Sequence, residues 1–125
     1  MTIAQVAKQF DLTPDTLRYY ERIGLLPQVH RSRGGIRDYT QDDCRWVQFI
    51  HCMRSAGLPI EALISYVTLF HQGAETSEAR KNILIEQREQ LAQRIANQQA
   101  VLARLDHKIE RYEQENKIHE AELKR

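Results

Sequence analysis

Apolar positions near the N-terminus recur at helical spacing and predict two short helices. A repeat over residues 3–10 predicts the first helix, and Thr2, followed three positions later by a glutamine, supplies a capping-box pattern. A second helix is predicted from Thr13, because Pro14 suits the first helical position, to a stop at Gly24. Two short helices joined by a tight turn are typical of a helix-turn-helix.

Two more helices are predicted further along the chain. The first begins at Thr40 or Asp42, either of which is a suitable cap, and ends at Gly57. The second runs from Pro59 to Gly73. Each carries an apolar face.

The segment between the second and third predicted helices has a different pattern. Residues 29–39 contain two short extended pieces on either side of Gly34 and Gly35. A glycine pair between such pieces favours a turn, so this segment predicts a small β-hairpin.

After Ala74 the pattern becomes that of one long helix. From about Ser77 onward there is no glycine or proline, and a set of positions alternates in steps of four and three, which is a heptad repeat. Such a helix is about 60 Å long, so we expect its seam to pair with a second copy rather than to pack on its own small domain, which is the alternative. The predicted dimerisation residues are Leu84, Leu91, Ile95, Leu102, Leu105, Ile109 and Tyr112.

Charge is unevenly distributed along the chain. Net charge is only +1, which does not by itself indicate nucleic acid. From Arg18 to Arg37, however, there are five basic residues and one acidic residue, whereas the part after Gly73 has ten of each sign. A local positive excess of this kind is typical of a phosphate-binding surface.

The sequence shows no sign of a membrane or secreted protein. No run approaches the roughly 18 apolar residues of a membrane-spanning helix. The N-terminus lacks the basic and apolar runs of a signal peptide, and Cys44 and Cys52 are too few for a disulfide framework. We therefore expect a cytoplasmic protein with no membrane partner.

Several segments together resemble the signature of the MerR family of transcription regulators. They are residues 3–7, 12–21 and 24–27, a wing-like segment at 31–40, and a second, helical wing at 49–60. The resemblance implies a mainly helical fold. A winged helix-turn-helix with a small β-hairpin wing would occupy residues 1–73, and a long C-terminal coiled-coil dimerisation helix, paired antiparallel, residues 74–125.

The resemblance also implies a mechanism. Members of the family bind, as homodimers, a palindrome lying between promoter elements that are set too far apart. The activated dimer bends and untwists the double-stranded DNA, so that RNA polymerase, an indirect partner, engages both elements. Recognition through DNA deformation is physically sensible here, because a protein that only occupied the spacer would block the polymerase.

The expected DNA contacts come from the second helix and the wing. Arg18 is the main candidate, since its guanidinium can grip phosphate or guanine in a bidentate way; the alternative is a solvated surface charge. Tyr20 is either a DNA contact or a core residue. The full set is Thr13, Asp15, Thr16, Arg18, Tyr19 and Tyr20 on the helix, with Arg31, Arg33, Arg37 and Tyr39 in the wing.

Cysteine positions bear on what switches the regulator. Metal-sensing members carry cysteines at the start of the dimerisation helix and beyond it, but here none follows Cys52, so no soft-metal site is expected. The stretch at 51–54 resembles a single-cysteine subgroup that responds to aldehydes, other carbonyl electrophiles or nitrosative stress, which makes Cys52 the candidate sensor thiol. The alternative is that Cys52 is a buried packing residue. Cys44 lies beside Asp42 and Asp43 and is the weaker candidate.

Nothing in the sequence indicates catalysis. It contains no recognisable nucleophile arrangement or glycine-rich phosphate loop, and we predict no cofactor, no metal and no enzymatic activity. The prediction is a sequence-specific DNA-binding transcription regulator that responds to thiol-reactive electrophiles. The alternatives are a related regulator with a different effector or none, and an adaptor whose coiled coil binds another protein.

Overall fold

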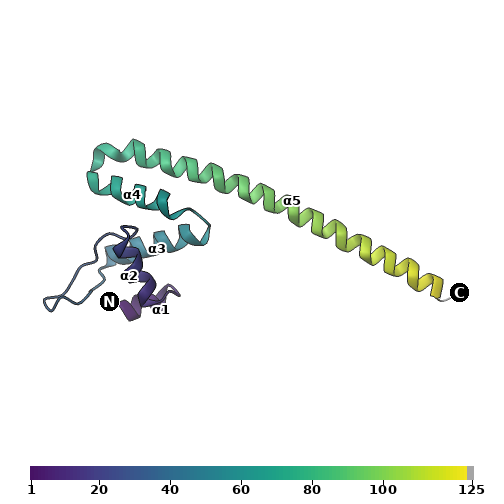
Figure 1. Ribbon diagram of the computed structural model, residues 1–125, viewed down its shortest axis with the longest axis horizontal. Coiled ribbons are helices and arrows are strands. Elements are labelled where there is room, and N and C mark those ends of the chain that lie inside the picture. Colours follow the sequence, from purple (N-terminus) through teal and green to yellow (C-terminus); the bar gives the residue numbers. More distant parts are fainter. Residues whose placement is uncertain (124–125) are drawn as a thin grey trace. The chain divides into compact units, whose positions relative to one another are not determined.

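A computed structural model describes residues 1–123, and helices account for most of them (Figure 1). The chain divides into two compact units, Met1–Arg88 and Glu89–Arg125. The elements are α1 (Ile3–Gln9), α2 (Pro14–Arg22), α3 (Gln41–Ser55), α4 (Ile60–Gln72), a 3-10 turn η1 (Ala74–Thr76) and α5 (Ser77–Leu123).

Local side-chain caps fix where the first two helices begin. At α1 the Thr2 hydroxyl accepts from the Gln5 amide at 3.1 Å, and the Gln5 side chain accepts from the Thr2 amide at 2.8 Å. At α2 the Thr13 hydroxyl accepts from the Thr16 amide at 3.1 Å, directly before Pro14. Both helix starts are therefore confirmed, because each cap satisfies amide groups that have no partner within the helix.

The residue that caps α3 is Thr40, not Asp42. The Thr40 hydroxyl accepts from the Asp43 amide at 3.1 Å, while the Asp43 carboxylate accepts from the Thr40 amide at 2.9 Å. Gly57 follows the end of α3 with a φ of 91°, a conformation that side chains rarely adopt. The predicted end of this helix is thereby confirmed.

One apolar core holds α1 to α4 together. Leu25 and Leu26, which follow α2, belong to this core. Their amides both donate to the Tyr20 carbonyl at 3.0 Å, and this turns the chain inward. Burying each such side chain contributes about 2 kcal/mol. The largest fully buried side chains are Val6, Leu17, Leu25, Leu26, Val47 and Ile50.

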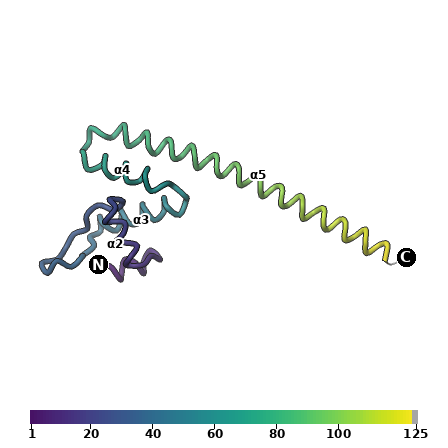
Figure 2. Tube along the Cα trace, viewed as in Figure 1, coloured from purple at the N-terminus to yellow at the C-terminus, as the bar shows by residue number. Residues whose placement is uncertain are grey.

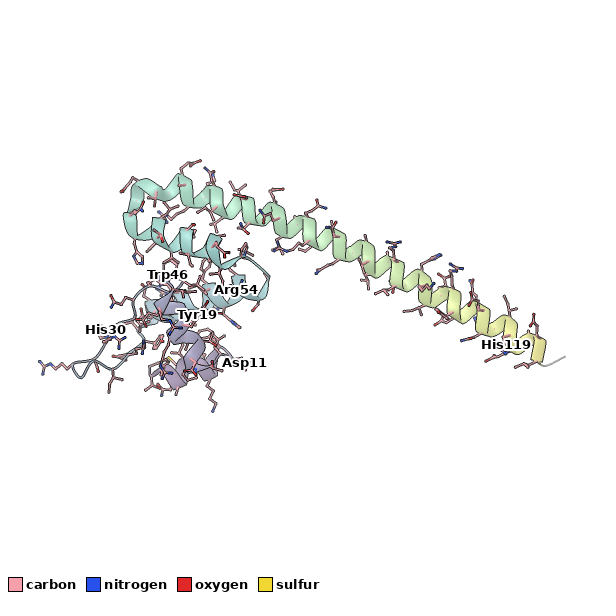
Figure 3. All side chains as sticks on the ribbon, in the orientation of Figure 1. Asp11, Tyr19, His30, Trp46, Arg54 and His119 are labelled. Atoms are coloured by element: carbon pink, nitrogen blue, oxygen red, sulfur yellow. The ribbon has the colours of Figure 1, made fainter. Side chains whose placement is uncertain are left out.

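An aromatic cluster joins α3 to α4. Trp46, whose place on α3 is labelled in Figure 3, lies with its ring centroid 4.9 Å from that of Phe70 and 6.2 Å from that of Phe49. The Tyr66 ring lies 5.5 Å from the Phe49 ring. Edge-on and tilted contacts of this kind add to the energy of burial.

The predicted β-hairpin of the wing is not confirmed, because residues 29–39 contain no named strand. The chain leaves α2, turns back on itself and returns to α3 (Figure 2), but the described residues contain only one antiparallel bridge, between Arg31 and Arg37. The Ser32 amide donates to the Ile36 carbonyl at 2.8 Å. A pair of strands has little support here. An isolated pair is only marginally stable in water, and a wing side chain such as Ile36, which is 70% exposed, has no surface to pack on.

The first turns of α5 belong to the N-terminal unit. That unit continues past the predicted boundary at residue 73 to Arg88. Thr76 is buried and its hydroxyl donates to the Leu69 carbonyl at 2.7 Å, which ties the start of the helix to α4. Gln87, on α5 and eleven residues after Thr76, is also buried.

The predicted seam on α5 is almost entirely exposed within the chain. Leu91 is half-buried, and the other six predicted dimerisation residues are between 38% and 59% exposed. A row of apolar side chains on a helix does not normally remain in water. Among residues 1–123, no helix has the length and apolarity to cross a membrane.

Candidate nucleic-acid interface

The N-terminal part of α2 presents the first group of predicted contacts. Arg18 is 46% exposed and its guanidinium lies 2.8 Å from the carboxylate of Asp15, one turn earlier. The Thr13 and Thr16 hydroxyls lie 2.8 Å apart and cap the helix. Arg18 is therefore held by an exposed partner that a phosphate can replace at little cost.

The two tyrosines of α2 have different environments. Tyr19 is 41% exposed, projects from α2 (Figure 3), and has the Arg22 guanidinium 5.5 Å from its ring centroid. Tyr20 is half-buried and packs against the core. Of the two interpretations of Tyr20, the structure favours the core residue, and Tyr19 remains the tyrosine available to a ligand.

A nearly buried carboxylate ties the wing to α2. Glu21 is 10% exposed and accepts a hydrogen bond at 2.9 Å from Nε of Arg37; a second wing guanidinium, that of Arg31, lies 3.8 Å away. Arg31 also donates to the Gly35 carbonyl at 3.0 Å. Arg33 is exposed. Glu21, which the sequence patterns did not single out, thus positions two of the three predicted wing arginines.

Tyr39 does not lie where the sequence predicted. We expected a phosphate contact, but the residue is 3% exposed and belongs to the apolar core. Its hydroxyl oxygen is buried and, within the described part of the chain, has no hydrogen-bond partner. Burial raises the pKa of this phenol, partly offset by the positive charge of Arg37. This burial favours a role in the core, which the local sequence does not reveal because the ring packs against distant segments.

A polar hollow of about 330 Å³ opens between α2 and the wing. Its lining includes Arg18, Glu21 and Arg37, which the chain brings together from two elements. Arg22 and Gln28 complete the lining and were missed at the sequence level. The available signal was that Arg22 lies four residues after Arg18, on the same side of the helix.

The two cysteines lie on α3 and are both free thiols. Cys52 is exposed, so the interpretation as a buried packing residue is wrong for this chain. Cys44 is half-buried, and burial raises the pKa of its thiol, against the opposing influence of the N-terminal ammonium. No group of three or more potential metal ligands occurs in residues 1–123.

Comparison with known protein families identifies the family of this chain. The family described as MerR HTH regulatory proteins matches residues 1–68, and a second family description, MerR DNA binding, matches residues 44–108. The chain belongs to the MerR family. The predicted family and its mainly helical fold with a long C-terminal helix are therefore confirmed.

Two similar proteins are also named as transcription regulators. The HTH-type transcriptional regulator AdhR of Bacillus subtilis is 64% identical over 91 residues, a match that covers 73% of this chain and 65% of AdhR, just under two thirds of its length. A MerR family regulator from Listeria monocytogenes has a crystal structure with a TM-score of 0.93 at 44% identity, covering 99% of this chain and 94% of that one.

A third relative has been solved on DNA. HiNmlR, a MerR family regulator lacking the sensor domain, was crystallised bound to promoter DNA, and its structure gives a TM-score of 0.83 at 27% identity, with 90% of each chain covered. The chain is thus similar to a protein that has been crystallised in complex with promoter DNA.

Proposed function

We propose that this MerR family chain is a transcription regulator that binds a promoter palindrome as a homodimer. The observation that carries the proposal is the hollow in which arginines of α2 and of the wing converge. Contacts of this type to the DNA backbone fix the register of a protein on the duplex. HiNmlR, bound to promoter DNA, supports the same use of the fold.

The dimer is proposed to form along the exposed seam of α5. The predicted residues from Leu84 to Tyr112 recur in heptads, and burial of such a seam against a second copy removes its apolar side chains from water. Two basic heads then face the two halves of a palindrome. The bound dimer bends and untwists the spacer, which lets RNA polymerase engage both promoter elements.

Cys52 is proposed to sense reactive carbonyl compounds. Its thiolate would attack the carbonyl carbon of an aldehyde: a C–S bond forms, the carbonyl π pair moves to oxygen, and that oxygen takes a proton to give a hemithioacetal. Exposure of Cys52 supports this assignment over the half-buried Cys44, whose raised pKa leaves less thiolate at neutral pH. The protein acts in this proposal by binding rather than by catalysis, in the cytoplasm.

The sensor assignment is tested with paired cysteine variants. Cys52→Ser should abolish induction of a reporter gene by an added aldehyde, whereas Cys44→Ser should leave induction within about twofold of the parent protein. Retained induction in Cys52→Ser would leave a regulator with another effector, or none.

The DNA-binding proposal has a separate test. The chain should bind duplex DNA with an affinity that falls steeply as salt rises, and Arg18→Ala should weaken binding by about tenfold or more. The adaptor interpretation predicts instead a heterologous protein partner and no salt-sensitive DNA binding. Either result decides between the two without reference to the effector.

A further inference from the structure

We propose that the hollow between α2 and the wing is a seat for a single phosphodiester group of the DNA backbone, and that Arg22 and Gln28 are further contacts to it. The inference rests on the proposed function as a DNA-binding regulator. It adds to that function two residues, neither of them predicted from the sequence, and a common ligand for side chains that come from separate elements.

The charge of the hollow suits one monoanion. Three guanidinium groups and one carboxylate line it. That carboxylate, from Glu21, is nearly buried and is already paired with Arg37 at 2.9 Å. Three guanidinium groups against one carboxylate leave a positive excess in the hollow, and a phosphodiester offers one negative charge and two oxygens that each accept several hydrogen bonds.

Arg22 is positioned to face this ligand. Its guanidinium lies 5.5 Å from the centroid of the exposed Tyr19 ring, a cation–π contact. A guanidinium held in this way leaves N–H groups free for an oxyanion. Arg22 also lies one helical turn after Arg18, so both side chains extend from the same side of α2.

Gln28 contributes a neutral donor to the lining of the hollow. It follows α2 in the segment where the chain turns toward the wing, and its side chain is exposed. A side-chain amide donates two N–H groups, and amides of this kind commonly contact DNA phosphates without reading sequence. Gln28 therefore complements the guanidinium groups without adding charge.

Convergence on one phosphate makes the contacts interdependent. Arg18 and Arg37 belong to different elements, yet both line the hollow together with Arg22. Two side chains that share one ligand compensate for one another, so the loss in affinity on removing both differs from the product of the single losses. Side chains that bind separate phosphates act independently.

The experiment measures binding of the full chain to a random-sequence duplex of about 30 base pairs over a range of salt concentrations. Arg22→Ala should lower the affinity by roughly fivefold to twentyfold at about 0.1 M salt and reduce the salt slope by about one per charge removed, or two per dimer. Gln28→Ala should lower the affinity by about threefold with an unchanged slope, because no charge is lost.

Controls separate this proposal from the function on which it rests. Arg45→Ala removes an arginine whose side chain is 69% exposed and lies outside the hollow, and this variant should bind as the parent protein does. The double variant Arg22→Ala, Arg37→Ala should show a loss that is not the product of the two single losses. Circular dichroism verifies that each variant is folded.

Each outcome bears on one proposal only. If the parent protein shows no salt-dependent binding, the regulator proposal fails before the hollow is tested. If the parent protein binds but Arg22→Ala and Gln28→Ala match it in affinity and slope, the hollow is not a phosphate seat, and DNA binding by α2 and the wing stands. Affinity losses with multiplicative arginine effects would also overturn the shared seat.

Discussion

A single carboxylate decides how the wing arginines are presented. Glu21 is almost buried between α2 and the wing, where it neutralises part of the charge of Arg31 and Arg37. Without it, two guanidinium groups would face each other across a loop that has only one backbone bridge. The Glu21 ion pairs thus hold the wing beside α2, in addition to the buried side chains at its two ends, Val29 and Tyr39.

Replacing Glu21 by Gln keeps the size of the side chain and removes its charge. We expect the free energy of unfolding to fall by about 1–2 kcal/mol, because Arg37 loses an ionic partner in a poorly solvated position. Asp15→Asn, which breaks the exposed pair with Arg18, should cost less than about 1 kcal/mol. Urea denaturation of both variants checks the difference, and equal losses would contradict the role assigned to Glu21.

Tyr39→Phe tests whether Tyr39 contacts DNA, as the sequence predicted, or serves the core. The hydroxyl is buried without a partner among the described residues, so its removal should leave stability at neutral pH unchanged or raise it by about 1 kcal/mol. Because burial raises the pKa of Tyr39, the unfolded chain loses this proton near the ordinary value of 10.0 while the folded chain keeps it. Stability should therefore fall as pH rises above about 10, and fall less in the variant.

Two measurements complete the test of Tyr39. Urea denaturation at neutral pH and above pH 10 gives the stability difference between the variant and the parent protein. Binding to duplex DNA gives the second readout, and Tyr39→Phe should leave the affinity unchanged. A clear loss of affinity would restore the phosphate contact that the sequence suggested.

At the scale of elements, local signals predicted helix starts well and the wing poorly. The side chains of three threonines accept hydrogen bonds from backbone amides a few residues further along the chain, so the sequence alone predicts them as caps. They are Thr2, Thr13 and Thr40. The wing depends on contacts between distant residues, such as Glu21 with Arg37. The hollow was missed for the same reason, since Gln28 has no local pattern that marks it.

The capping box of α3 provides a test at this scale. Thr40→Ala removes the acceptor for the Asp43 amide and should reduce the free energy of unfolding by about 1 kcal/mol. Thr68→Ala, an exposed position within α4, serves as the control and should change stability by less than about 0.5 kcal/mol. Chemical denaturation followed by circular dichroism measures both, and an unaffected Thr40 variant would contradict the capping role.

At the scale of the whole molecule, the predicted seam of α5 is mostly exposed among residues 1–123. The long helix that carries it could be predicted from the sequence, because such a helix needs only its own periodicity. The partner chain, by contrast, is inferred from what the seam requires.

A double substitution, Leu102→Asp with Leu105→Asp, should convert the dimer to a monomer. Charges at these adjacent seam positions would be buried without partners in the paired helices. Sedimentation velocity measures the mass in solution, and affinity for a palindromic duplex should drop by about 100-fold as bivalent binding is lost. Ala100→Asp, on the opposite side of the heptad, should leave the mass unchanged; a dimer that survives the double substitution would overturn the seam.

The aromatic cluster on α3 and α4 gives the protein a built-in optical probe. Trp46 is the only tryptophan of the chain, and its ring packs on Phe70 within the N-terminal unit. Its fluorescence therefore reports melting of the DNA-binding head, while α5, the longest helix, contributes about half of the helical residues that give the far-ultraviolet ellipticity. Two noncoincident melting curves would show that the head and the long helix unfold as separate cooperative units.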